Sequence, residues 1–592
     1  MCGINAIYNS IGISQQHIGI VEKMNNEMLY RGPDSQVVWN NESIVFGHNR
    51  LSIIGIENGS QPLFSLDKSL TLVCNGEIYN YLELKDELIK KGYKFNTSSD
   101  CEVIIYLYQE YGLELFKRLR GMFAFCLWDA NKKLLLASRD RLGKKPLYYS
   151  RSSNGIVFSS ELKAISKHFL SSYNFNYSSI RHTLKYSHPI DMVDTHINEI
   201  KKIRPGEYII VKDDCISNQL YWNSNKIKTI NTDYNTAKKR TLEILTESVE
   251  LRLRSDVPVA ILLSSGIDST AVAALAKKCR QEIHAITVGY KGNHASDERE
   301  LAQKFAKEYG LIWHQVELDE KDYLDYFEEY SAVIDEPVCD VAAIAQWGIY
   351  KKAKNLGFKV LLSGIGGDEL FYGYGSHNEY SENWQKTLKI TEYFPINNTL
   401  GFIAFTKYIF SNRKSLNNFS LNSPINHLAK YYIKDFEAFK FNWPDSLQNE
   451  QIDELSDIFS KKETAIEKLY KYLYDIWLIN NCFHQTDKLG LGNSVEVRAP
   501  FADHILNEYI LSLPLEIKYK PNNPKWLLKE TMKDILPEYI LNNPKKGFTP
   551  PSDYINHIIK SYDSKFYSLK LNNFNQVLTD KVLFSHKAQA NN

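Results

Sequence analysis

The sequence predicts an α/β protein of two domains: an N-terminal αββα sandwich of antiparallel sheets and a C-terminal doubly wound parallel α/β sheet with added helices. Its 592 residues are too many for a single hydrophobic core. Up to about residue 222, short apolar runs are separated by turn residues, which is typical of stacked antiparallel sheets. Beyond about residue 236, apolar strands alternate with helices, which favours a parallel sheet.

The N-terminal strands are predicted from β-rich runs bounded by Asn, Gly, Asp and Lys. These runs are 43–47, 70–74, 123–128, 134–138 and 207–211. Helices are expected at Ile18–Tyr30, Tyr81–Lys91 and Cys101–Arg118. The first domain is therefore predicted to be mixed rather than all-β.

A polar segment, Asn223–Asn235, separates the two patterns. It is rich in Asn, Lys and Thr and lacks a clear period, so it is interpreted as the interdomain linker. We accordingly expect a first domain over residues 1–222 and a second over residues 236–590.

The second domain opens with a predicted helix whose apolar positions fall on one face. These positions are Leu242, Leu245, Val249 and Leu253. The predicted elements that follow are strand Val257–Leu263, helix Ser269–Lys278, strand His284–Val288, helix Asp297–Tyr309, strand Ile312–Glu317 and strand Lys359–Leu362. This alternation predicts a doubly wound sheet. Residues 376–470 are predicted to be helical, in no assigned order.

Composition excludes several classes of protein. The formal net charge is +1, from 71 basic and 70 acidic side chains, which gives no electrostatic reason for a nucleic-acid partner or an anionic membrane surface. The N-terminus lacks the basic and apolar regions of a signal peptide, and no apolar stretch approaches the ~20 residues of a membrane helix. The eight cysteines are scattered without CxxC or zinc-ligand spacing. We expect a cytoplasmic protein with reduced thiols.

One cysteine has a special position. Cys2 follows Met1 directly, so removal of the methionine would leave a cysteine with a free α-amine. An α-amine has a pKa near ~7.7–8, and one residue can then supply both the nucleophile and the base that activates it. On its own, a cysteine at the second position could equally be chance.

Further short motifs accompany Cys2. In chain order they are Met1–Ile4, Arg31–Asp34, His48–Ile53, Asn75–Asn80, Ser98–Asp100, Gly121–Phe125 and Ser138–Tyr149. Together and in this order they resemble the class II (N-terminal nucleophile) glutamine amidotransferases, and in particular the asparagine synthetase group. The Arg31–Asp34 turn (RGPD) is expected to be a structural loop bordering the site.

This resemblance implies a catalytic Cys2 and a glutamine pocket made by Arg50, Asn75, Gly76, Glu77 and Asp100. The side-chain chemistry suits these roles. An arginine can clamp the glutamine carboxylate bidentately, and two acids can accept its ammonium group. The amide of Asn75 and the N–H of Gly76 can stabilise the oxyanion, which is typically worth ~10²–10³ in rate per donor.

A second chemical site is predicted where the strand Val257–Leu263 meets a small-residue turn, Ser264–Thr270. A strand, a turn and a helix N-terminus form a cradle for phosphates, although such turns are also common without ligands. The Walker motif is absent. The turn instead resembles the pyrophosphate loop SGGxDS of the N-type ATP pyrophosphatases, with Ser265 in place of the first glycine. Glycine is needed there only if the position requires a positive φ.

A second Gly-rich turn, Ser363–Phe371, resembles the SGxGxDE motif of the synthetases. The resemblance implies binding of ATP and Mg²⁺. Predicted ATP-binding residues are Leu263, Ser264, Ser265, Gly266, Asp268, Ser269, Val288, Ser363 and Gly364, with Asp268 and Asp368 as metal ligands. The segment Pro544–Phe548 resembles the family's RPKxGF, and Lys545 is predicted to balance charge on the departing pyrophosphate. Three further matching stretches are Asp297–Glu298, Asp335–Pro337 and Ser494–Phe501.

One residue departs from the pattern. The third position of SGxGxDE is a carboxylate in well-studied asparagine synthetases, thought to assist attack by ammonia, and here it is Ile365. An aliphatic side chain cannot accept a proton. Either another acid, such as Glu369 or Asp335, takes over, or the enzyme amidates a different carboxylate.

Three functional hypotheses follow. The first is an asparagine synthase that adenylates aspartate and transfers ammonia from glutamine to the acyl-adenylate. The second is a sibling amidotransferase or cyclase acting on a sugar uronate, a peptide or another metabolite. The third is a catalytically silent binding protein. The resemblance also implies an internal passage for ammonia and a homodimer, neither of which the sequence displays.

Overall fold

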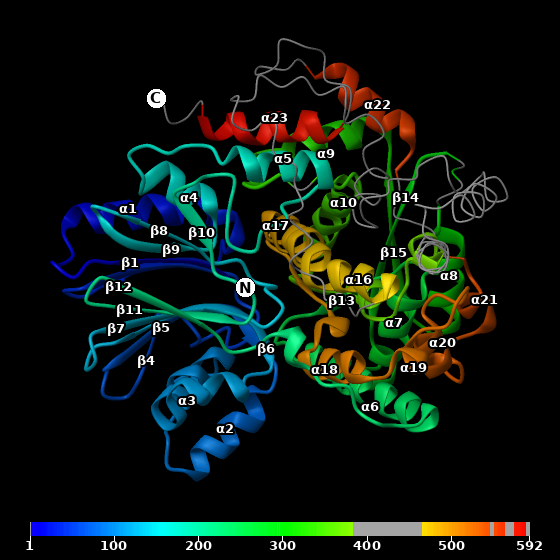
Figure 1. Cartoon of the computed structure of the whole chain (residues 1–592), viewed down its shortest axis with the longest axis horizontal. Coiled ribbons are helices and arrows are strands. Elements are labelled where there is room, and N and C mark those ends of the chain that lie inside the picture. Colours follow the sequence, from blue (N-terminus) through cyan, green and yellow to red (C-terminus); the bar gives the residue numbers. More distant parts are fainter. Residues whose placement is uncertain are drawn as a thin grey trace, which may run out of the picture.

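Two halves of unequal construction lie side by side in the computed structural model (Figure 1). The structure describes residues 2–292, 294, 297–337, 339–379, 381–382, 464–544, 550–562 and 574–587. Much of the predicted helical stretch 376–470 therefore lies outside the described residues, as does Lys545. No helix in the described parts of the chain is long and apolar enough to span a membrane.

The N-terminal half contains two stacked antiparallel sheets. The first has the order β10 (Ile200–Lys202), β8 (Tyr148–Ser152), β9 (Gly155–Ser159), β1 (Cys2–Tyr8), β3 (Ile44–Arg50), β2 (Ser35–Asn40). The second has the order β12 (Cys215–Leu220), β11 (Glu207–Lys212), β7 (Leu134–Arg139), β6 (Gly121–Asp129), β5 (Leu70–Ile78), β4 (Leu63–Phe64). Their facing apolar side chains, among them Ile4, Phe46, Val73, Ala124 and Phe158, form one buried core.

Helices cover the outer face of each sheet. α1 (Gln15–Glu27) and α4 (Leu162–His168) pack on the first sheet. α2 (Tyr81–Lys90) and α3 (Val103–Tyr111) pack on the second. Both faces of β5 are thus covered, and all nine of its residues are buried. The predicted αββα sandwich is confirmed.

Two predicted helices of the N-terminal half are divided into shorter helices in the structure. The expected helix Cys101–Arg118 is divided into η2 (Asp100–Glu102), α3 and η3 (Gly112–Lys117). Gly112 has φ +55°, a conformation that glycine adopts readily and that ends an α-helix. The short helix η1 (Leu29–Arg31) similarly follows α1 in place of a continuous helix to Tyr30.

The C-terminal half is built on a parallel sheet with the order β15 (Ile312–Leu318), β14 (His284–Tyr290), β13 (Val259–Leu262), β16 (Val360–Leu362), β17 (Glu496–Arg498). Ile261 faces a cluster formed with α6 (Tyr234–Arg252), α7 (Ile267–Cys279) and α8 (Arg299–Glu308). Ala260 faces the opposite cluster, which is formed with α9 (Glu320–Val333), α10 (Ala342–Asn355) and α17 (His484–Gly492). Helices therefore cover both faces, and the doubly wound prediction is confirmed.

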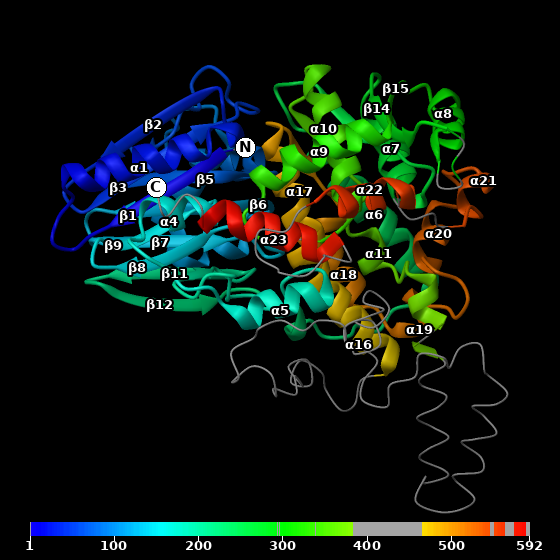
Figure 2. The ribbon, with the colours of Figure 1, turned by 90° about the horizontal axis from the view of Figure 1, so that it is seen from above.

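The helices of this half are α6 (Tyr234–Arg252), α7 (Ile267–Cys279), α8 (Arg299–Glu308), α9 (Glu320–Val333), α10 (Ala342–Asn355), α11 (Gly367–Leu370), α16 (Ala465–Tyr472), the π-helix η8 (Leu473–Phe483), α17 (His484–Gly492), η9 (Pro500–Ala502), α18 (His504–Ser512), α19 (Leu515–Lys518), α20 (Trp526–Met532), α21 (Glu538–Leu541), α22 (Ser552–Ser561) and α23 (Phe574–Lys587). α5 (Tyr177–Tyr186) and η4 (Ser224–Lys226) precede them in the chain. α23 packs on α4 and α5 as well as α9, so it bridges the two halves (Figure 2).

Strand order places a topological switch point between β13 and β16. The chain runs outward from β13 through β14 to β15 and then returns to the other side of β13 with β16. Ligands of open α/β sheets bind beyond the carboxyl ends of the strands at such a point. Both Gly- or Ser-rich turns, 264–270 and 363–369, follow these two strands.

Candidate active sites

Cys2 begins β1 and lies at the mouth of the gap between the two N-terminal sheets. Its side chain is buried, and its backbone nitrogen donates to Asn75 Oδ1 on β5 at 3.1 Å. Removal of Met1 would turn this nitrogen into a free α-amine already held by an amide oxygen. The predicted nucleophile and base are thus fixed in place by one hydrogen bond.

Asn75 and Gly76 occupy the positions expected of oxyanion donors. The Asn75 Nδ2 is buried and has no hydrogen-bond partner among the described residues, which leaves both of its N–H groups for a ligand. A Cβ at Gly76 would lie 2.3 Å from the Met122 oxygen and 2.6 Å from the Phe123 Cα on β6. Only glycine therefore allows the two strands to approach here.

Arg50 is brought to the site by strand register, since it pairs directly with Cys2 across β1 and β3. Its guanidinium donates to the Gly55 oxygen at 2.5 Å and the Ile56 oxygen at 3.2 Å. These carbonyls hold the guanidinium beside the nucleophile. That Arg50 binds the carboxylate of glutamine stays a prediction.

Three buried carboxylates and one guanidinium meet at the inner end of the pocket. Arg498 Nη2 lies 3.2 Å from Glu77 Oε2, and Arg498 Nε lies 2.5 Å from Glu496 Oε1. Asp100 Oδ2 accepts from the Ile78 N–H at 2.7 Å. Burial, and then the charge of Glu496, raise the pKa of Glu77 well above its usual range, while Arg498 opposes the shift. This surplus of buried acid suits a ligand that carries an ammonium group.

We expect hydrolysis of glutamine at this site to weaken as the pH falls below about 6. Burial raises the pKa of Asp100 to about 6, so its carboxylate accepts an ammonium group only above that pH. Glutamate release measured from pH 5 to 8 should show kcat/KM falling about tenfold per unit below the α-amine pKa of ~7.7–8, and about a hundredfold per unit below about pH 6, where Asp100 is protonated as well. An Asp100→Asn variant should lose the additional fall in kcat/KM below about pH 6 and keep only the fall set by the α-amine at ~7.7–8. A flat wild-type profile between pH 5 and 7 would contradict the assignment.

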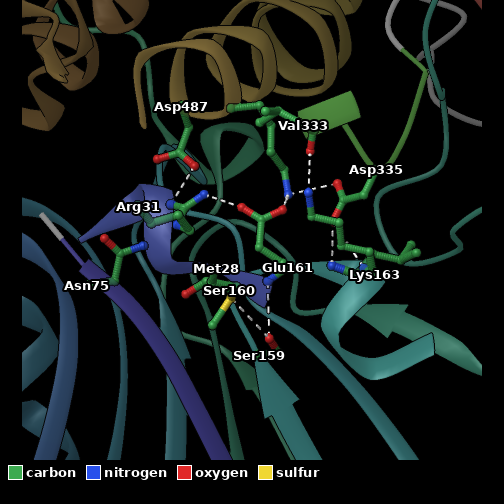
Figure 3. A network of polar contacts seen from close by, with 12 residues as sticks. Met28, Arg31, Asn75, Ser159, Ser160, Glu161, Lys163, Val333, Asp335 and Asp487 are labelled. Atoms are coloured by element: carbon green, nitrogen blue, oxygen red, sulfur yellow. Dashed lines mark hydrogen bonds and ion pairs between the residues drawn. The ribbon is translucent and has the colours of Figure 1, made fainter. Parts of the chain in front are cut away.

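A buried ion network joins the nucleophile's strand to the C-terminal half (Figure 3). Arg31 Nε donates to the Cys2 oxygen at 3.3 Å. The same guanidinium contacts Glu161 at 2.5 Å and Asp487 of α17 at 2.8 Å. The predicted RGPD loop is therefore structural, but it also connects β1 to the other half.

Asp335 belongs to the same network. Its Oδ2 accepts from the backbone nitrogens of Leu162 and Lys163 at 2.6 and 3.2 Å, and its Oδ1 lies 2.8 Å from Lys488 Nζ. Lys488 also pairs with Glu161. These contacts make Asp335 a structural acid at the start of α4, which removes it as a substitute for the missing carboxylate.

The first predicted nucleotide loop is held by its own hydroxyl groups. Ser264 Oγ lies 2.8 Å from Ser269 Oγ and accepts from the Gly266 N–H at 3.1 Å. Gly266 is the N-cap of α7, so the helix N-terminus faces the turn as a phosphate cradle requires. Ser265 is not among the residues with positive φ. Serine therefore fits the position without strain.

The two loops touch at the switch point. A Cβ at Gly364 would lie 2.8 Å from both Asp268 Cβ and the Ser269 nitrogen. Only glycine permits this approach, which brings Ser363 and Gly364 beside the first loop. Leu263 donates its N–H to the Ile286 oxygen at 2.9 Å. Together with Val288 on β14, it lies at the carboxyl end of the sheet, where the adenylate pocket is predicted.

Asp268 and Asp368 converge on one cation. Lys525 Nζ lies 2.8 Å from Asp368 Oδ1 and also pairs with Asp268. Two carboxylates that share one ammonium are close enough to share one divalent ion, and Mg²⁺ is commonly held by one or two carboxylates plus substrate phosphates. Within the described ranges, no three His, Cys, Asp or Glu side chains are grouped to hold a metal. The pair therefore fits Mg²⁺ that arrives with a nucleotide.

Ile365 and Glu369 have different surroundings within the second loop. Ile365 is partly buried against the hydrophobic core, so its side chain serves packing. Glu369 is buried, accepts from the Tyr374 hydroxyl at 2.5 Å, and lies 3.9 Å from Cys482 Sγ. Of the two acids considered as substitutes for the missing carboxylate, Glu369 is therefore the one that lies in this loop.

Four residues at these sites had no predicted role. Arg498 and Glu496 lie in the stretch Ser494–Phe501, but its sequence does not indicate that their side chains contact the N-terminal half. Lys525 carries no sequence signal. Asn543 lies two positions before Lys545 in the sequence. Its Nδ2 donates to Ser265 O and Oγ at 3.1 and 2.9 Å.

Two family models match this chain. The asparagine synthase family model matches residues 240–585, and the glutamine amidotransferase domain model matches residues 1–222. The chain is 32% identical to asparagine synthetase (glutamine-hydrolyzing) 1 of Bacillus subtilis (strain 168), over 95% of this chain and 88% of that protein. It is 31% identical to asparagine synthetase (glutamine-hydrolyzing) 3 of the same organism, over 93% and 87%. It is also 28% identical to amidase chry2 of Gibberella zeae, over 94% and 89%.

Among solved structures, the chain is similar to glutamine phosphoribosylpyrophosphate amidotransferase from B. subtilis, with 15% identity and a TM-score of 0.29. The similarity covers 53% of this chain and 90% of that one. So low a score leaves the fold to be judged from the strands and helices described above.

Proposed function

The chain belongs to the asparagine synthase family and carries a glutamine amidotransferase domain, and we propose that it is an asparagine synthase, with aspartate as the carboxylate it amidates. Family membership supports the coarser activity, glutamine-dependent and ATP-dependent amidation. The hydrogen bond between the Cys2 nitrogen and Asn75 Oδ1 supports the glutamine half most directly. We assign that half to residues 1–222 and the synthetase half to residues 236–590.

In the glutamine half, the Cys2 thiol attacks the carboxamide carbon of glutamine. The α-amine, held by Asn75, takes the thiol proton and later passes it to the departing ammonia. The Asn75 Nδ2 and the Gly76 N–H face the developing oxyanion. Glu77 and Asp100 accept the substrate's ammonium group. Water then releases glutamate from the enzyme.

In the synthetase half, the acceptor carboxylate attacks the α-phosphorus of ATP and releases pyrophosphate, because a free carboxylate is a poor electrophile. Residues 264–269 and Ser363–Gly364 hold the phosphates and adenylate, and Lys545 balances charge on the departing pyrophosphate. Mg²⁺ bound by Asp268 and Asp368 would neutralise phosphate charge. Ammonia then displaces AMP, and Glu369 takes the proton that it loses.

Two observations favour a second class of acceptor. Ile365 replaces a carboxylate of the related synthetases, and the relative named amidase chry2 is similar over 94% of this chain. A sibling enzyme acting on a sugar uronate, a peptide or another metabolite carboxylate would retain both halves of the mechanism. The acceptor is therefore the part of the proposal that most needs a direct test.

The full-length protein with glutamine, Mg·ATP and aspartate as sole acceptor is expected to form AMP, pyrophosphate and asparagine in equal amounts. Aspartate-dependent AMP release is measured against a reaction without acceptor and one with glutamate as a matched dicarboxylate. Lack of aspartate-stimulated AMP release at millimolar concentration, with glutaminase intact, would reject aspartate. A panel of uronates and carboxylate metabolites would then identify the acceptor.

A further inference from the structure

We propose that Arg498, a residue of the synthetase half, is a positioning residue of the glutamine pocket and ties that pocket to the predicted nucleotide loop. The inference rests on the proposed function, because it requires glutamine to be the ligand of Glu77. It goes beyond that function by giving the glutaminase a required residue from the other half of the chain.

The guanidinium of Arg498 is held by three contacts and faces Glu77 with its remaining nitrogen. It has no exposed surface. Its Nη1 donates to the Arg252 and Arg254 oxygens at 2.9 and 2.5 Å, and its Nε pairs with Glu496 at 2.5 Å. Only Nη2 remains, 3.2 Å from Glu77 Oε2 and with no hydrogen bond among the described residues. The guanidinium is therefore built to present one N–H edge to the glutamine pocket.

The backbone of the same residue contacts the nucleotide loop. Arg498 pairs with Leu362 in the parallel register of β16 and β17. Its oxygen accepts from the Ser363 N–H, at the first position of the loop, at 2.8 Å. A single residue thus contacts both predicted sites. The path from Ser363 to the guanidinium beside Glu77 therefore consists of one hydrogen bond and the Arg498 residue itself, and this is the path by which nucleotide binding would act on the glutamine pocket.

Electrostatics explain what the guanidinium does for Glu77. This carboxylate faces Asp100 on η2 and Glu496 on β17, and Tyr79 follows directly after the end of β5. Burial and Glu496 raise the pKa of Glu77, and Arg498 is the largest influence that lowers it. Without Arg498 the pKa of Glu77 would rise further, so a smaller fraction of this acid would be ionised at any given pH. It would then lose its attraction for a substrate ammonium group.

The test uses full-length protein and glutaminase kinetics, which need no acceptor. Arg498→Met is expected to raise KM for glutamine roughly 10–100-fold, with kcat within about threefold, because ground-state binding is lost. Raising the pH should recover part of the loss, more than in wild type, because loss of the Arg498 charge raises the pKa of Glu77 further. Arg498→Lys keeps the charge and should show an intermediate KM.

Arg120→Met is the matched control. Arg120 is also a buried arginine that pairs across the two halves, with Asp503 at 2.8 Å, but it does not contact Glu77. Its glutamine KM should stay at the wild-type value. Saturating Mg·ATP should change the wild-type KM for glutamine, and this effect should be lost in Arg498→Met.

Several results would overturn the inference. An unchanged KM and pH profile in Arg498→Lys would do so even if Arg498→Met failed to fold. An equal rise in KM in Arg120→Met would assign the effect to general loosening of the interface. No effect of Mg·ATP on wild type would reject the tie to the nucleotide loop. A wild-type protein that released no glutamate would instead refute the proposed function, before any variant was made.

Discussion

Replacing Cys2 by alanine is expected to lower glutamate release from glutamine by at least roughly 10⁴-fold, since removal of a nucleophile that acts with its base costs on this scale. The same variant should still consume ATP with its acceptor when ammonium chloride replaces glutamine. The residues of the two predicted nucleotide loops all lie in the C-terminal half, whereas Cys2 lies on β1 of the N-terminal half, so loss of the thiol should leave the synthetase loops intact. Coupled assays for glutamate and for AMP measure both outcomes on one preparation.

The structure offers a close control for this experiment. Cys74 is another buried cysteine and directly precedes Asn75 on β5. A Cys74→Ala change removes a thiol of the same size from the same region, yet glutaminase activity should stay within a few-fold of wild type. Mass spectrometry should also show that purified protein begins at Cys2. Retention of Met1, or a fully active Cys2→Ala variant, would refute the nucleophile.

The residues around Cys2 were predicted from short motifs and their resemblance to a known family. The apolar run 70–74 that leads to Asn75 and Gly76 was recognisable as a strand, and in the structure this strand continues to Ile78. Cys2 meets these residues through the stacking of two sheets, because β1 belongs to the first sheet and β5 to the second. The same reasoning predicted the nucleotide loops, because a strand followed by small residues and a helix is a local pattern.

Contacts between the halves could not be predicted in this way. Arg31 and Asp487, which lie in different halves, are 456 positions apart, and even within the C-terminal half Lys525 reaches Asp268 across 257 positions. Nothing in the local sequence distinguishes a buried arginine or lysine from a solvated one. β17 is only three residues long and reads as part of a loop, so its place beside β16, and hence the reach of Arg498 to Glu77, follows from tertiary packing alone.

Glu369→Gln is expected to lower amide formation by about 10²–10⁴-fold, the usual contribution of a positioned general base. Ammonia becomes a protonated amine as it attacks the acyl-adenylate, and a nearby acceptor must remove that proton. Ile365 has no group that can do so. Glu369 lies in the same loop, buried and held by the Tyr374 hydroxyl at 2.5 Å. Glutamine in its place keeps the volume and the hydrogen bond but cannot take the proton.

The distinctive outcome is a separation of the two synthetase steps. Acceptor-dependent exchange of pyrophosphate into ATP should persist in Glu369→Gln, because adenylation does not use this acid, while amide product is lost. Tyr374→Phe should cause a smaller loss, since it only releases the carboxylate from its orientation. Asp335→Asn is the control at another buried acid. Breaking the pair between Asp335 and Lys488 should cost about 3–5 kcal/mol of stability, but it should not separate pyrophosphate exchange from amide formation. Equal loss of exchange and amide formation in Glu369→Gln would assign Glu369 to the adenylation step and leave the proton acceptor to be found among other groups.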